Sequence, residues 1–164
     1  MTTPTTISLH PSRLGQIKMI SHNLGIGIAE TIEHLIGEKI RAGTIPDTTP
    51  GVTLEPEGAL LAVTIGNATI RLTFAEVDHL ADQFGIIVGA EERTAGYKLP
   101  LVHGGYWLVG RVGRGFMIVI TDTAGHAAKF TATRAMLYDL GRQMFNASIA
   151  GIETLKEPEP EPVV

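Results

Sequence analysis

The chain has 164 residues, of which 44% are hydrophobic and 18% charged, so it can form a folded core. It contains no cysteine, which excludes disulfides, a thiolate nucleophile and cysteine-ligated zinc. No apolar run approaches the roughly 20 residues of a membrane-spanning helix. The first ten residues lack the basic start and apolar centre of a secretory signal. We therefore expect a cytoplasmic protein with no membrane partner.

The formal net charge of −4 is concentrated at the C-terminus. From Ile152 onward four glutamates outweigh one lysine, which leaves a net charge of −1 on the preceding 151 residues. Because the body of the chain is nearly neutral, any site for a polyanion must be a local patch.

The N-terminal forty residues carry the clearest pattern. Residues 6–10 alternate between polar and apolar, which is typical of a short strand with Ile7 and Leu9 on one face. Apolar residues at helical spacing then predict one helix over 11–24 and a second over 27–42. These residues are Leu14, Ile17, Ile20, Leu24, Ile28, Ile32, Leu35, Ile36 and Ile40.

A strand and two helices of this size cannot bury both apolar stripes within one chain. A lone strand also leaves its hydrogen-bonding edge unpaired. Both problems are solved if two copies pair their strands antiparallel and share their helices. Residues 1–43 are therefore predicted to form a strand-helix-helix dimerisation module, in a homodimer or a higher oligomer.

Residues 5–42, a quarter of the chain, resemble the ribbon-helix-helix family of DNA-binding proteins, whose members are dimers of this layout. The resemblance implies that a two-stranded ribbon enters the major groove of double-stranded DNA. It implies that the base-reading residues are Thr6, Ser8 and His10. It also implies phosphate contacts by Arg13, Lys18 and the backbone amides of Gly27 and Ile28 at a helix N-terminus.

The segment departs from the family pattern in three ways. The outward strand positions hold no Arg, Lys, Asn or Gln, and Gly27 stands where Ser or Thr commonly caps the second helix, with Glu30 at the third helical position. Residues 1–46 carry four basic and three acidic residues, a low positive charge for a protein that releases counterions from DNA. A dimerisation arm without a DNA partner is the alternative interpretation.

Residues 44–57 hold three prolines and little periodicity, and are predicted to be a linker. An α+β domain over 58–151 follows, built from two β-hairpin-plus-helix units. Its predicted strands are 58–66, 68–72, 105–112, 116–122 and a short 126–130. Its first predicted helix begins at Thr73, where Glu76 completes a capping box, and ends at Gly85. Its second predicted helix begins at Thr131.

Residues 152–164 form an acidic, proline-rich tail that we expect to be extended and solvated. A solubilising role and a partner-docking role both remain open for this tail.

One patch in the second domain has the character of a binding site. Its residues are Arg111, Arg114, Arg134, Tyr138 and Arg142, and an aromatic ring flanked by arginines suits an anionic ligand. A solvated helix face is the alternative. The glycine-rich run 110–115 lies between two predicted strands and is interpreted as a hairpin turn rather than a phosphate loop.

The six histidines lack metal-ligand spacing, and the sequence has no catalytic triad, nucleophile elbow or dinucleotide motif. We therefore predict no metal site, no cofactor and no enzymatic activity. The leading hypothesis is a dimeric DNA-binding protein, such as a small transcriptional repressor or a plasmid or phage accessory factor. The alternative is an oligomeric binding or structural protein that engages a protein or small anionic ligand through its C-terminal domain.

Overall fold

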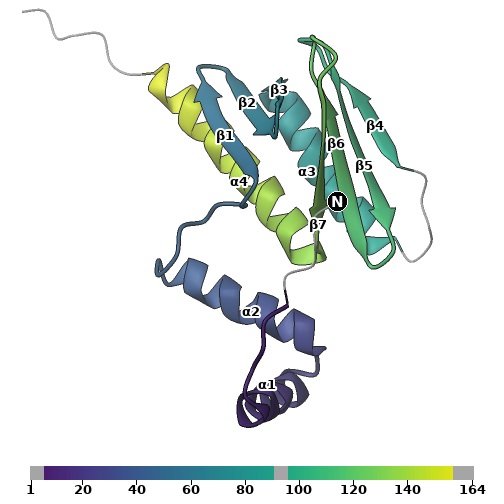
Figure 1. Cartoon of the computed structure of the whole chain (residues 1–164). Helices are drawn as coiled ribbons and strands as arrows, with labels where there is room; N and C mark the ends of the chain where they lie inside the picture. The colour runs from purple at the N-terminus through teal and green to yellow at the C-terminus, as the bar shows by residue number, and fades with distance from the viewer. Residues whose placement is uncertain (1–5, 91–95, 157–164) are drawn as a thin grey trace, which may run out of the picture. The chain divides into compact units, whose positions relative to one another are not determined.

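The computed structural model describes residues 6–90 and 96–156, which form an α+β protein with four helices and two antiparallel sheets (Figure 1). The chain divides into an N-terminal unit, residues 1–47, and a C-terminal unit, residues 48–164. In the described ranges no helix combines the length and apolar character needed to cross a membrane.

The N-terminal unit contains helices α1 (Pro11–Leu24) and α2 (Ile28–Arg41), which confirms both predicted helices. α1 ends at Gly25, whose φ of 67° lies in the left-handed region that glycine adopts without strain. The Gly25 N–H donates to the carbonyl of His22, and α2 begins three residues after Gly25.

The C-terminal unit contains two sheets, each followed by a helix. The first sheet has the order β1 (Val52–Glu57), β2 (Leu60–Ile65), β3 (Ala68–Thr73) and leads into α3 (Phe74–Gly89). The second has the order β4 (Tyr97–Pro100), β5 (Tyr106–Val112), β6 (Gly115–Thr121), β7 (Ala127–Ala132) and leads into α4 (Arg134–Thr154).

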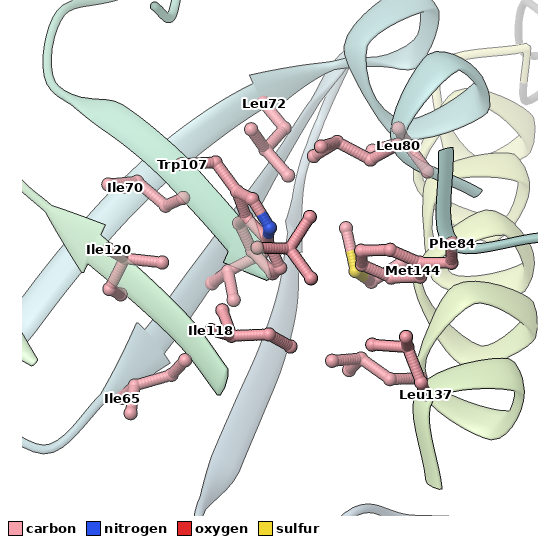
Figure 2. Close-up of a cluster of buried hydrophobic side chains, with 14 of the residues drawn as sticks. Ile65, Ile70, Leu72, Leu80, Phe84, Trp107, Ile118, Ile120, Leu137 and Met144 are labelled. Carbon is pink, nitrogen blue, oxygen red and sulfur yellow. The ribbon is translucent and has the colours of Figure 1, made fainter. Parts of the chain in front are cut away.

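A single core joins the two sheets and the two helices of this unit (Figure 2). Trp107 of β5 is fully buried, and its ring lies 5.9 Å from that of Phe84 in α3. Alternate residues of the strands enter this core, as expected for sheets with one covered face. Other fully buried side chains are Leu61, Leu72, Leu80, Ile118, Ile120, Leu137 and Leu140.

The two halves of the C-terminal unit form an internal repeat. Thr73 and Thr133, sixty positions apart, each cap a helix by accepting the backbone N–H of the third helical residue. The buried residues Val77, Leu80 and Phe84 of α3 correspond in the same way to Leu137, Leu140 and Met144 of α4. The helix start predicted at Thr131 is two residues before the observed cap Thr133, because β7 continues to Ala132.

Several predicted boundaries were wrong. The predicted linker 44–57 contains β1, an edge strand, where a proline without an N–H is tolerated. β4 was not predicted. α3 continues past Gly85 to Gly89, because the burial of Ile87 and Val88 outweighs the weak helix propensity of glycine.

The start and end of the last helix, α4, also differ from the prediction. α4 begins at Arg134 instead of Thr131 and ends at Thr154, beyond the predicted domain end at 151. The predicted tail 152–164 therefore starts inside a helix, and its residues 157–164 lie outside the described part of the chain.

Candidate nucleic-acid interface

Residues 6–10 form no strand in the described chain, so the predicted strand-helix-helix order is not observed there. A strand requires a hydrogen-bonding neighbour, and no described segment pairs with these residues. Thr6, Ser8 and His10 are exposed as expected, but Ile7 and Leu9 are also exposed, by 79% and 45%. Both faces of this segment therefore contact solvent in the single chain.

His10 caps α1 in addition to its predicted role as a base reader. The backbone N–H of Ser12 donates to His10 Nδ1 at 3.3 Å, and the Ser12 hydroxyl oxygen lies 2.7 Å from the same atom. The side chain thus satisfies one of the free amides at the helix start. Thr6 and Ser8 have no comparable role in the structure and remain the simplest candidates for base contacts.

The two cations predicted to contact phosphate lie on α1. Arg13 is exposed and donates to Gln16 Oε1 at 2.9 Å, a surface contact that a phosphate could replace. Lys18 is also exposed and lines a shallow hollow with Met19, His22 and Asn23. The other three residues that line this hollow carry no carboxylate, so the hollow itself presents no negative charge to an anion at Lys18.

The start of α2 differs from the predicted phosphate site. The Gly27 N–H donates to Glu30 Oε2 at 2.9 Å, so a carboxylate of the same helix already occupies this amide. A negative charge at this point opposes a second anion. Ile28, at the first helical position, is exposed, and its amide is the part of the predicted site that Glu30 leaves open.

The N-terminal unit has almost no core of its own. Thr31 is its one buried residue among the described positions, and its hydroxyl donates to the carbonyl of Gly27 at 2.9 Å. Large apolar side chains are instead at least one-third exposed along both helices. They are Leu14, Met19, Ile20, Leu24, Ile28, Ile32 and Ile36.

The arginines predicted as an anion patch in the C-terminal unit do not form one free cluster. Arg111 Nη1 donates to the carbonyl of Ala90 at the end of α3, at 2.7 Å, which neutralises a helix C-terminus. Arg142 pairs with Asp139 at 2.8 Å. Arg134 and Tyr138, the other predicted patch residues on α4, are exposed.

Arg114 lies in the turn between β5 and β6, and this turn is next to the end of β7. A Cβ added to Gly115 would lie 3.0 Å from the carbonyl oxygen of Ala132, just before α4 begins. Arg114 and Arg134 are thus the predicted patch residues that the fold leaves exposed near the start of α4.

Two polar contacts of the C-terminal unit were not predicted from the sequence. Glu76 is buried and forms the predicted capping box, in which it accepts from the N–H and hydroxyl of Thr73, but it also accepts from the N–H of Val102 at 2.7 Å, which was not predicted. Asp122 accepts the N–H groups of Ala124 and His126 and lies 3.0 Å from His126 Nδ1. Both clusters tie loops to the fold, and an aspartate four residues before a histidine in a predicted turn was the available signal for the second.

No group of three or more histidines, aspartates and glutamates in the described residues is placed to hold a metal ion. The chain matches no protein-family model, and comparisons with curated proteins and with solved structures give no significant relative.

Proposed function

We propose that the chain forms a homodimer through its N-terminal unit and that the dimer binds duplex DNA through residues 6–18. The observation that carries this proposal is the exposure of apolar side chains on both helices and on the segment before them. A unit of about forty residues with one buried side chain cannot offset the entropy of ordering its backbone. A second copy supplies an identical apolar surface against which these side chains can be buried.

The dimer also accounts for the alternation in residues 6–10. If the two copies pair these segments antiparallel, Ile7 and Leu9 are buried against the shared helices, and Thr6 and Ser8 remain on the opposite face. Hydroxyl groups on such a ribbon can hydrogen-bond to base edges in the major groove. Arg13 and Lys18 follow directly in α1 and can contact the phosphates beside the groove. A protein of this kind would act as a small transcriptional repressor or as a plasmid or phage accessory factor.

The test is a fluorescence-anisotropy titration of the full chain against random duplex DNA at low and moderate salt. We expect binding that weakens steeply as salt increases, because phosphate contacts release counterions. Replacing Arg13 and Lys18 by alanine should weaken binding to all sequences and reduce the salt dependence. The matched control removes the same charge from the other end of the unit, in Lys39→Ala/Arg41→Ala, and should have a smaller effect.

Replacing Thr6 and Ser8 by alanine should instead reduce the preference for particular sequences while non-specific affinity remains. His10 is left unchanged in this test because it caps α1. If the full chain has no affinity for duplex DNA at low salt, the DNA-binding part of the proposal is wrong, and the dimer is a purely structural arm.

A further inference from the structure

The shallow hollow on α1 is formed by four exposed residues of one helix. They are Lys18, Met19, His22 and Asn23. Ser21 marks the other side of α1, because it is half-buried and its hydroxyl donates to the carbonyl of Ile26, just before α2. With 3.6 residues per turn, Leu14 and Leu24 lie on the Ser21 side, whereas Met19 and Asn23 lie opposite. A second copy that covers the apolar side of α1 therefore leaves this hollow open.

Three of the four side chains in the hollow are hydrogen-bond donors. The Lys18 ammonium has three N–H groups, the Asn23 amide has two, and the His22 imidazole has at least one. Lys18 and His22 are one helical turn apart and are therefore neighbours on the helix surface. Within the described ranges, none of these three side chains forms a hydrogen bond or an ion pair with another residue. Their donors are thus free to bind an anion.

The charges of the N-terminal unit are divided between its two helices. Residues 1–29 contain Arg13 and Lys18 but no aspartate or glutamate, which gives them a formal charge of +2. The carboxylates of α2 have contacts of their own, since Glu30 accepts a backbone N–H and Glu38 lies 3.6 Å from His34. The net charge of +1 over residues 1–46 therefore understates the positive charge on α1.

We propose that the hollow on α1 binds a phosphate group of the DNA backbone, with Lys18, His22 and Asn23 as its donors. This inference rests on the proposed function, in which Lys18 contacts phosphate, and adds two residues one turn further along α1. The ammonium supplies the opposite charge, while the imidazole and amide N–H groups supply hydrogen bonds to phosphate oxygens. Met19 is 67% exposed and gives the hollow an apolar wall for the adjoining sugar, which favours a nucleotide backbone over a free inorganic anion.

The first test is a fluorescence-anisotropy titration of the full chain against random duplex DNA at pH 8. His22→Ala/Asn23→Ala should weaken binding by at least about tenfold, because two hollows in each dimer lose hydrogen bonds to a charged group. The slope of log affinity against log salt should not change, since neither side chain is charged at this pH and neither releases a counterion. Lys18→Ala should instead reduce that slope.

The second test uses inorganic phosphate and no DNA. In an NMR titration of the isotope-labelled full chain, the amide signals of Lys18, His22 and Asn23 should shift and reach saturation. Sodium chloride at the same ionic strength should not reproduce these shifts, and His22→Ala/Asn23→Ala should remove the shift at Lys18. The matched control is His34→Ala, which removes an exposed histidine from α2 and should change neither measurement.

The two tests separate this inference from the proposed function. If His22→Ala/Asn23→Ala binds duplex DNA as tightly as the unsubstituted chain, the inference is wrong and the proposed function stands. The inference is also wrong if sodium chloride shifts the same signals equally, or if His34→Ala weakens DNA binding to the same extent. Phosphate shifts at the hollow, in a chain with no affinity for duplex DNA at low salt, would support the phosphate site and overturn only the DNA partner.

Discussion

Gly141 in α4 lies against Ala81 in α3, and these two residues occupy equivalent positions of the internal repeat. A Cβ added to Gly141 would lie 3.8 Å from both Cα and Cβ of Ala81, and 3.3 Å from Cδ2 of Phe84. A contact between equivalent positions indicates that the axis relating the two repeats passes through this helix crossing. The absence of a side chain at Gly141 allows the two helices to approach closely there.

Gly141→Leu should therefore destabilise the C-terminal unit by about 2–3 kcal/mol, because a large side chain would push α3 and α4 apart in a packed core. Urea unfolding of the full chain measures this change. Ala150→Leu makes a similar addition at an exposed position of the same helix and should change stability by no more than about 0.5 kcal/mol. Equal effects of the two substitutions would contradict the close helix crossing.

Two glycines with positive φ differ in what surrounds them, so adding a Cβ at each should destabilise the fold to a different extent. Gly105 has a φ of 79°, and a Cβ there would lie 2.2 Å from the carbonyl oxygen of Thr121. Gly113 has a φ of 60°, with no atom within 4 Å of an added Cβ. Gly113→Ala should cost about 1–2 kcal/mol from strain alone, and Gly105→Ala at least about 3 kcal/mol. Thermal unfolding should rank them in this order, and the reverse order would show that the loop does not pack on β6 as described.

The turn between β6 and β7 predicts a pH dependence of stability. Burial acts to raise the pKa of Asp122, but hydrogen bonds from His126 and Ala124, together with the charge of His126, lower it below its ordinary value. Because the folded pKa is the lower one, this carboxylate stabilises the fold above the unfolded pKa of about 3.9, and the contribution is lost as pH falls through the folded pKa.

Asp122→Asn should thus lower the melting temperature near neutral pH, and the difference from the unsubstituted chain should shrink as the pH falls below about 3.9. Thermal melts over a pH series measure this difference. A difference for Asp122→Asn that does not vary with pH would contradict the role of its charge.

The elements with strong local signals were predicted from the sequence. The capping box of Thr73 and Glu76 located the start of α3, since both of its hydrogen bonds depend on residues three apart. Proline at the first position and glycine at the end located α1 in the same way. In contrast, β1 and β4 are edge strands that contain Pro56 and Pro100, and proline is typical of a linker as well as of an edge strand. Both strands were missed although each pairs with the next strand along the chain.

The candidate site residues were harder to predict from the sequence. A side chain can bind a ligand only if no residue distant in the sequence already occupies it, and a local pattern does not show such contacts. Arg111 was predicted to bind an anion, but the fold brings it to the end of α3, twenty-one residues earlier in the chain, where it donates to Ala90.

The central claim is that the N-terminal unit completes its core with a second copy, and size-exclusion chromatography with light scattering tests it most directly. We predict that the full chain has about twice its 17.5 kDa mass, and that Ile32→Glu/Ile36→Glu converts it to a single chain, while the control Lys39→Glu does not. The C-terminal unit should keep its melting transition in all three proteins. A full chain of 17.5 kDa over a range of concentrations would contradict the account and remove the basis for the proposed DNA-binding ribbon.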